Sequence, residues 1–513
     1  ITPTVSDNGT VTIGEQKAEN GKATEVSLKI GSQEIPITVT STNGAVETTT
    51  LHVLRNVDGS AYTVPTRPQY HFSQAMGWSN DPNGMLYYKG EWHLFFQYNQ
   101  ARTTWGELEW GHAVSKDLIH WEELPRPLNY QEDNGAMFSG CGVVDDENTS
   151  GLFGDEKGPG KGGLIALYTQ NNELNGHRGQ DQCIAYSKDN GRTWTKYKGN
   201  PILKWDEDHL KDTAFRDPKV FRHDGKWFMV LAGGILRIYS SDDLIHWNIE
   251  STYKGSDDIG NPAGLRVETE CPDMYPLTAD DGTTKWVISE GGRYYRIGDL
   301  KKIDGHWTFV QDKDSDRYVM NFGPHSYAAM TYYIGNGETT NGKPENRRIM
   351  INWASTWADG YCNNVDKVTG QWGYNGFFNL QTELNVKKID GKYKLVQTPI
   401  DEYKTLRVNE AATKLENVTI PKKTENSENL LSGVKAGQYE VVAELTPQAG
   451  TKEVGFKLRT NKSGSQETVV SYNTETKKVS INGEKSGTHP AGQQTKNIVS
   501  DAIVTEKDGK VKL

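Results

Sequence analysis

The chain has 513 residues, which is long enough for roughly two to four domains with a sizeable core. Its net charge of -10 at pH 7 argues against a nucleic-acid partner, because phosphate binding needs clustered lysine and arginine. No run of about 18 apolar residues is present, so a membrane-spanning helix is not expected. The 4 cysteines lack CxxC spacing, and we expect neither a metal site nor a cofactor.

The first 65 residues are expected to form a small β module. They contain no tryptophan and alternate polar with β-branched residues, as in residues 10–13 and 35–40. This pattern is typical of a few strands from an Ig-like domain. Residues 63–68 hold two prolines and predict a linker. The polar chain ends, rich in Thr, Asn and Gly, are typical of exported proteins, so we expect an extracellular location, secreted or on the cell surface.

Residues 66–398 are rich in aromatic residues and turn pairs but poor in helical periodicity, which predicts an all-β region. The first acidic candidate, Asp81, lies in the turn-rich segment 77–84, where Asp-Pro and Asn-Gly disfavour a core strand. A hairpin is expected to follow, with strands over residues 85–88 and 92–98. The carboxylate of Asp81 would then lie on a loop at the mouth of a rigid sheet.

The same arrangement recurs at Asp217 and Glu270. Each acid has a proline within two residues, followed by a strand, a glycine-containing turn and a return strand led by tryptophan. Two further strand openings, at residues 138–141 and 323–326, carry no acid. Five equivalent openings arranged radially would converge on one axis, as in a five-bladed β-propeller. The three acids would then share a pocket, although they lie far apart in the sequence.

A second repeat lies in the outer part of this region. Residues 115–121 match residues 241–247, and residues 187–194 are a looser copy. Ser and Asp are expected to cap a turn here, while Trp packs between sheets. We therefore interpret His120 and His246 as turn residues and not as ligands.

Residues 399–408 are expected to form a linker that contains a short helix. The chain then becomes rich in Lys, Glu and Thr, with alternating strands over residues 439–445 and 467–472. This pattern predicts a C-terminal β-sandwich over residues 409–513. Its last residues, 510–513, look like a strand just begun, so the sandwich is expected to be incomplete.

Three of these segments resemble the signature boxes of glycoside hydrolase family 32, which contains invertases, inulinases and levanases. The boxes are residues 78–84 (WSNDPNG), 215–218 (FRDP) and 270–272 (ECP). Secondary matches occur, in the family's order, at residues 96–97, 105–106, 138–140 and 353–357. The resemblance covers roughly residues 68 to 510. It implies an all-β fold with a five-bladed β-propeller followed by a β-sandwich.

The resemblance also implies roles for the three acids. Asp81 would be the nucleophile, Glu270 the general acid/base, and Asp217 a transition-state stabiliser that binds sugar hydroxyls. In a retaining mechanism the nucleophile and the acid are about 5–5.5 Å apart. The two neighbouring aspartates are expected to raise the pKa of Glu270, and Arg216 is expected to keep Asp217 ionised.

Further residues are candidates to bind the sugar. Arg216 can donate hydrogen bonds to sugar oxygens. The remaining candidates are Asn80, Gln97 and Ser139 as hydroxyl partners, with Trp105 and Trp357 as apolar walls of the fructosyl pocket. Residues 378–384 (FNLQTEL) stand where the family usually has a Pro-Arg-Glu-Leu stretch, which leaves the substrate preference open.

The resemblance implies a retaining hydrolase of β-D-fructofuranosidic bonds in fructans of levan or inulin type, in fructo-oligosaccharides or in sucrose. We expect a monomer whose partner is this carbohydrate. Two alternatives differ in class. Residues 187–194 resemble the Asp-box of sialidases, but an arginine triad is not evident. A non-catalytic fructan-binding surface protein would have no need of the pair Asp81 and Glu270.

Overall fold

The fold is described from a computed structural model. The chain divides into two compact units. The first contains Ile1–Pro399 and His489–Gln494, and the second contains Ile400–Thr488 and Thr495–Leu513. The structure describes residues 1–6, 8–55, 61–130, 135–172, 179–205, 214–233, 235–253, 270–334, 347–422, 424, 427–487, 489–490, 498–499, 503–504 and 506–513.

The N-terminal segment forms one antiparallel sheet. Its strands, in the order in which they pair, are β2 (Gln16–Ala18), β1 (Thr10–Ile13), β3 (Gly31–Thr40) and β4 (Val46–Arg55). Val11, Ile13 and Ile35 are buried in its small core. The alternation of β-branched with polar residues therefore produces the strands that the sequence predicted here, because it gives each strand one apolar face.

Five antiparallel sheets, the blades, follow in the first unit. Blade 1 contains β5 (Gly77–Tyr88), β6 (Glu91–Asn99), β7 (Glu109–Ser115) and β8 (Trp121–Leu128), with β24 (Tyr374–Asn375) parallel to β5. Blade 2 contains β9 (Ala136–Asp145), β10 (Gly163–Asn171), β11 (Gln180–Ser187) and β12 (Thr195–Lys196). Blade 3 contains β13 (Arg216–His223), β14 (Lys226–Ala232), β15 (Leu236–Ser241) and β16 (Asn248–Tyr253). Blade 4 contains β17 (Asp273–Thr278), β18 (Thr284–Glu290), β19 (Tyr294–Ile303), β20 (His306–Gln311) and β21 (Tyr318–Val319). Blade 5 contains β22 (Tyr327–Thr331), β23 (Ile349–Trp353), β25 (Thr382–Ile389) and β26 (Lys392–Pro399).

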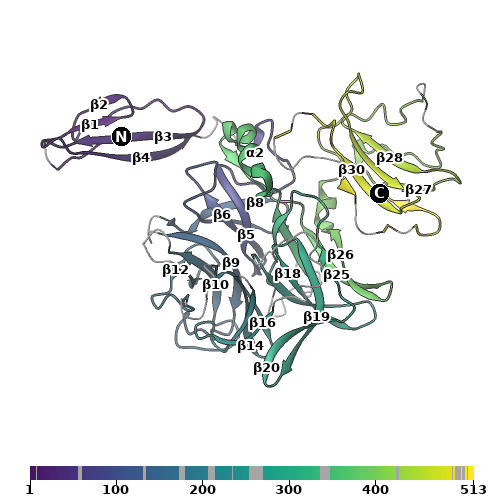
Figure 1. The fold of residues 1–513 in the computed structure, drawn as a ribbon, viewed down its shortest axis with the longest axis horizontal. Helices are drawn as coiled ribbons and strands as arrows, with labels where there is room; N and C mark the ends of the chain where they lie inside the picture. The colour runs from purple at the N-terminus through teal and green to yellow at the C-terminus, as the bar shows by residue number, and fades with distance from the viewer. Residues whose placement is uncertain are drawn as a thin grey trace. The chain divides into compact units, whose positions relative to one another are not determined.

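The first strand of each blade lies closest to a common axis. β5 contacts β9 and β22, β9 contacts β13, and β13 contacts β17. Figure 1 shows the blades arranged in a ring. The hydrophobic core lies between neighbouring blades, as where Leu167 of β10 packs with Val220 and Met229 of blade 3. Because every blade begins on the inside, all five predicted strand openings lie around the axis.

The segment that carries Asp81 is a strand and not a loop, contrary to the sequence prediction. β5 runs from Gly77 to Tyr88, and its register against β6 shifts twice within the segment. Such bulges accommodate Pro82, which has no N–H for a regular ladder. A similar shift lies at the start of β13, where Asp217 has a φ of 62°. Both aspartates thus lie at irregular positions, where a bulge turns a side chain away from its regular direction.

The outer repeats form capped turns, as predicted. Asp117 accepts hydrogen bonds from the backbone N–H groups two and three residues later, and Asp243 does the same. His120 and His246 contact these aspartates through Nδ1 at 2.7 Å. The two histidines are therefore part of the turns.

The second unit begins with a 3-10 helix, η5 (Asp401–Leu406), where a short helix was predicted. The predicted strand over residues 467–472 is observed as β29, but residues 439–445 form a strand only at their last two residues. Residues 439–442 are exposed, so they lack the packing that favours a strand. The strands of this unit are β27 (Glu444–Leu445), β28 (Glu453–Leu458), β29 (Thr468–Asn473), β30 (Lys478–Asn482), β31 (Ile498–Val499) and β32 (Val511–Lys512). Among the described residues of the chain, no helix has the length and apolar character needed to cross a membrane.

Candidate active site

Asp81 is almost buried near the start of the innermost strand of blade 1, with 9% of its surface exposed. Its Oδ2 accepts hydrogen bonds from the Ser139 hydroxyl at 2.6 Å and from Cys271 Sγ at 3.3 Å. Its Oδ1 accepts a hydrogen bond from Asn80 Nδ2 at 3.1 Å. Burial raises the pKa of Asp81 more than these hydrogen bonds lower it. Donors from three blade openings thus fix the orientation of this carboxylate.

Asp217 is buried at the opening of blade 3, in a left-handed backbone conformation that aspartate tolerates better than most residues. Its backbone N–H donates to Thr169 Oγ1 at 3.1 Å. Its Oδ2 accepts a hydrogen bond from the backbone N–H of Cys271 at 2.8 Å. Burial raises the pKa of Asp217 to about 7, which the Arg216 guanidinium opposes and the neighbouring carboxylates reinforce.

Glu270 is the most exposed of the three acids, and its environment differs from our expectation. Its Oε1 lies 2.5 Å from Arg216 Nη2, and its Oε2 accepts a hydrogen bond from the Tyr327 hydroxyl. Burial raises the pKa of Glu270, but Arg216 and Tyr327 outweigh this effect and lower it. We expected a raised pKa here and an Arg216 that keeps Asp217 ionised. Both expectations were wrong, because the guanidinium contacts Glu270 and only its Nε comes within 4.0 Å of Asp217.

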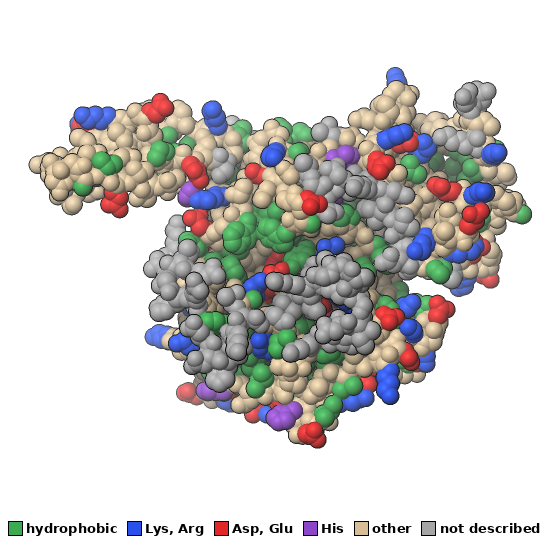
Figure 2. Space-filling model, viewed as in Figure 1, with side chains coloured by type: hydrophobic (Ala, Val, Ile, Leu, Met, Phe, Trp, Pro, Cys, Tyr) green, Lys and Arg blue, Asp and Glu red, His purple; other side chains and the backbone are tan. Residues whose placement is uncertain are grey.

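Cys271 brings the three acids together. Its buried thiol lies 3.3 Å from the Asp81 carboxylate and 3.6 Å from the Asp217 carboxylate, and Glu270 precedes it in the chain. On the face shown in Figure 2, acidic side chains lie near the middle of the propeller and are bordered by hydrophobic ones. Several carboxylates in a partly buried site provide the groups for nucleophilic and general acid-base chemistry on a polar substrate.

Asn80, Gln97 and Ser139 are buried and hydrogen-bonded within the protein. Asn80 accepts a hydrogen bond from Trp78 Nε1 at 2.8 Å while its amide group donates to Asp81. Gln97 donates to a backbone carbonyl of blade 2 at 3.0 Å. Asn80 and Ser139 thus act on the Asp81 carboxylate itself, which the sequence did not indicate.

Trp105 and Trp357 are partly open to solvent, with 49% and 39% of their surfaces exposed. The ring of Trp105 lies 6.4 Å from that of Phe138, which directly precedes Ser139. The ring of Trp357 lies 5.8 Å from that of Trp78, the donor to Asn80. Each tryptophan therefore contacts a neighbour of a residue that hydrogen-bonds Asp81.

Three residues of the site were missed in the sequence. Tyr327 donates to Glu270, Thr169 accepts from the backbone of Asp217, and Gln180 accepts from Arg216 Nη1 at 3.3 Å. Tyr327 begins the first strand of blade 5, directly after an opening that has no acid. The position of that opening is a usable signal for a site residue, since every opening faces the axis.

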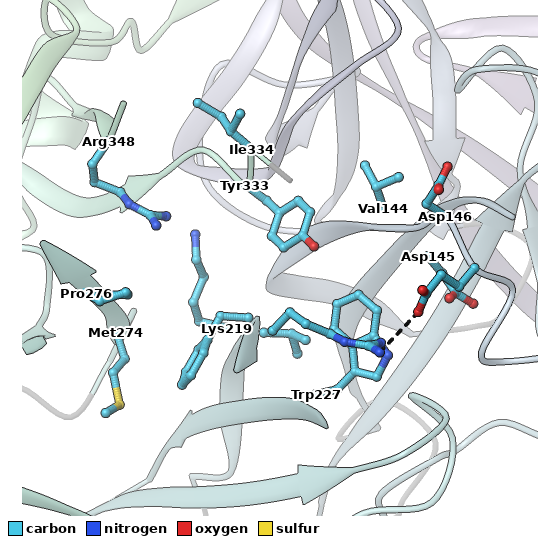
Figure 3. Close-up of a pocket in the computed structure, with 14 residues that line it drawn as sticks. Val144, Asp145, Asp146, Lys219, Trp227, Met274, Pro276, Tyr333, Ile334 and Arg348 are labelled. Carbon is cyan, nitrogen blue, oxygen red and sulfur yellow. Dashed lines mark hydrogen bonds and ion pairs between the residues drawn. The ribbon is translucent and has the colours of Figure 1, made fainter. Parts of the chain in front are cut away.

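A cavity of about 420 Å³ lies further along the inner strands than the acids do. Figure 3 shows Lys219 and Arg348 on one side of it and Asp145 and Asp146 on the other. Lys219 follows Asp217 by two residues, so one strand contributes first to the acid cluster and then to the cavity. Asp145 accepts four hydrogen bonds from the turn that follows it. We assign no reaction to this cavity, because its carboxylates stabilise the fold.

Known proteins resemble this chain in sequence and in fold. The fructan beta-fructosidase of Streptococcus mutans is 44% identical over 462 residues, which cover 90% of this chain and 30% of that protein. The levanase of Bacillus subtilis is 38% identical over 474 residues, which cover 89% of this chain and 64% of that protein. The chain thus spans less than two thirds of the length of these relatives.

The exo-inulinase of Aspergillus awamori has a solved structure that matches with a TM-score of 0.67 and 28% identity, over 88% of this chain and 89% of that chain. A fructofuranosidase from Schwanniomyces occidentalis matches with a TM-score of 0.65 and 23% identity, over 89% and 88% of the two chains. These likenesses confirm the expected fold class, a β-propeller followed by a β-sandwich.

Family models match the first unit from residue 71 onward and almost the whole of the second unit. The N-terminal domain model of the glycosyl hydrolases family 32 matches residues 71–399, and the C-terminal model of this family matches residues 402–513. The chain therefore belongs to glycoside hydrolase family 32.

Proposed function

We propose that this chain is the catalytic part of a retaining hydrolase of β-D-fructofuranosidic bonds in levan, inulin, fructo-oligosaccharides or sucrose. The observation that carries the proposal is the gathering of Asp81, Asp217 and Glu270 around one cysteine at the blade openings. Relatives named fructan beta-fructosidase, levanase and exo-inulinase support the substrate class. They favour it over a sialidase-like enzyme or a non-catalytic fructan-binding protein.

The reaction proceeds in two displacements. In the first, an Asp81 oxygen attacks the anomeric carbon of the fructosyl unit while Glu270 gives its proton to the glycosidic oxygen. The bond between that carbon and that oxygen breaks, and the leaving sugar departs with the proton. In the second, Glu270 takes a proton from water, and the water oxygen displaces Asp81 from the anomeric carbon. Asp217 accepts hydrogen bonds from fructosyl hydroxyls and stabilises the oxocarbenium-like transition states.

Glu270 has to be protonated when the bond is cleaved, although Arg216 stabilises it as an anion in the structure. In the free protein Asp217, with a pKa of about 7, binds a proton more readily than Glu270, whose pKa is lowered. A bound fructosyl unit changes this order, because hydroxyl groups that donate to Asp217 favour its ionised form. The proton is then available to Glu270, beside the glycosidic oxygen.

Trp105 and Trp357 would form apolar walls of the fructosyl pocket, since both are partly exposed beside the acid cluster. Gln97 and Arg216 would bind sugar hydroxyls. We further propose that the protein acts outside the cell, secreted or on its surface, because relatives include an extracellular exo-inulinase.

The test compares Asp81→Ala and Glu270→Ala with wild type on levan, inulin and sucrose, each incubated separately. Both variants should lose fructose release, while their melting temperatures stay near that of wild type. For Glu270→Ala the rate of fructose release should fall by about 10²–10⁴-fold. Glu122→Ala, which removes an exposed carboxylate from β8, is the matched control. Turnover at the wild-type rate in either variant would overturn the role given to that residue. Chromatography of the products separates release of single fructose units from release of oligosaccharides.

A further inference from the structure

A stacked pair of rings stands at the opening of blade 5. The imidazole of His325 and the ring of Tyr361 lie with centroids 4.1 Å apart and planes 14° from parallel. Both side chains are half-buried. The backbone of His325 is held by Asn379, whose Nδ2 donates to the His325 carbonyl at 2.9 Å. The pair is thus a fixed aromatic surface that keeps part of its area open to solvent.

This pair lies on the side of Glu270. His325 precedes Tyr327 by two residues at the same opening, and Tyr327 donates its hydroxyl hydrogen bond to Glu270. Tyr361 begins the helix α2 (Tyr361–Thr369), which lies between two strands of blade 5 in the sequence. One member of the stacked pair, His325, is therefore two residues along the chain from Tyr327, which contacts the general acid.

A short turn connects this pair to the side of Asp81. The backbone N–H of Gly360 donates to the carbonyl of Trp357 at 3.2 Å, and Asp359 and Gly360 both have left-handed backbones with φ of 54° and 64°. Trp357 contacts Trp78, which hydrogen-bonds the partner of Asp81. Residues 357–361 thus extend from the nucleophile side of the site to the acid side.

Given the proposed function, on which this step rests, the fructosyl unit lies between Asp81 and Asp217. The leaving sugar then extends past Glu270, because this acid has to reach the glycosidic oxygen. We propose that His325 and Tyr361 form the binding surface for the first sugar ring on the leaving-group side. A furanose or pyranose ring places its apolar face on this pair, which therefore sets the preference for an oligosaccharide over a fructoside with a small leaving group.

The experiment measures kcat and KM for two substrates, an inulin-type trisaccharide and methyl β-D-fructofuranoside, whose leaving group has no ring. The readout is the ratio of kcat/KM for the trisaccharide to that for the methyl fructoside. Tyr361→Leu and His325→Ala should each lower this ratio by about tenfold, mainly through a higher KM for the trisaccharide. Tyr361→Phe keeps the ring and should retain at least half of the wild-type ratio.

Tyr393→Ala is the matched control, because Tyr393 is a half-buried tyrosine on β26, the outermost strand of the same blade. Its ratio should equal that of wild type. A ratio within twofold of wild type in both Tyr361→Leu and His325→Ala overturns the inference. An equal loss of kcat/KM on both substrates also overturns it, because such a loss indicates a structural role only. A wild-type protein that releases fructose from neither substrate overturns the proposed function, and this inference with it.

Discussion

Replacing Asp217 with asparagine should stabilise the propeller at neutral and alkaline pH while it impairs catalysis. The carboxyl group has a pKa of about 7 in the folded protein, compared with an ordinary value of 3.8. Between about pH 3.8 and pH 7 the folded state binds this proton more tightly than the unfolded state does, so the stability of the folded protein falls as the pH rises. The cost of ionising this buried group is absent below about pH 3.8 and complete above about pH 7. Asparagine keeps the oxygen that accepts from Cys271 but carries no charge.

The size of the effect follows from the pKa difference. A difference of about 3 units corresponds to at most about 4 kcal/mol, since each unit is about 1.4 kcal/mol. A domain of about 330 residues has an unfolding entropy of about 0.7 kcal/mol per kelvin. The melting temperature of the propeller at pH 8 should therefore rise by about 3–6 °C in Asp217→Asn.

Differential scanning calorimetry at pH 8 and pH 4 checks this expectation. The transition of the propeller has to be followed separately, because a chain of several domains need not unfold in one step. Asp224→Asn is the matched control, since Asp224 is exposed in the β13–β14 turn. A melting temperature at pH 8 that does not rise, or a gain at pH 4 as large as that at pH 8, would refute the reasoning. The first result would mean that the folded protein does not resist ionisation of this carboxyl group.

Three further substitutions have definite expected outcomes. Tyr327→Phe removes a donor that lowers the pKa of Glu270, so the basic limb of the pH-kcat profile should move to higher pH. A limb that stays in place would contradict this expectation. Ser139→Ala removes a donor that lowers the pKa of Asp81, so the acidic limb of the pH-kcat profile should move to higher pH. A shift of this limb to lower pH would contradict the expectation. Gly140→Ala would place a Cβ atom 2.0 Å from a carbonyl oxygen of β10, so the melting temperature in thermal unfolding should fall by several degrees. An unchanged melting temperature would contradict this expectation.

The sequence was sufficient for the architecture because strand signals and blade openings are local. Turn residues, Trp-led return strands and β-branched runs identify most of the strands, and the repeated openings predict the ring. The limits of strands are less local. Residues 77–84 are irregular by composition but pair with β6 through two bulges, because a neighbouring strand on each side offsets the unfavourable turn residues. Residues 439–442 have a strand pattern but no such packing.

The sequence alone determined the residue types that meet at the axis: Asp81, Asp217 and Glu270, each at the start of a blade. Only the tertiary structure decided how they are paired. Arg216 is adjacent to Asp217 in the chain, yet its guanidinium contacts Glu270, because closure of the ring brings the openings of blades 3 and 4 together. The physical reason is that ion pairs and burial depend on distances across blades, which the order of residues along one strand does not contain.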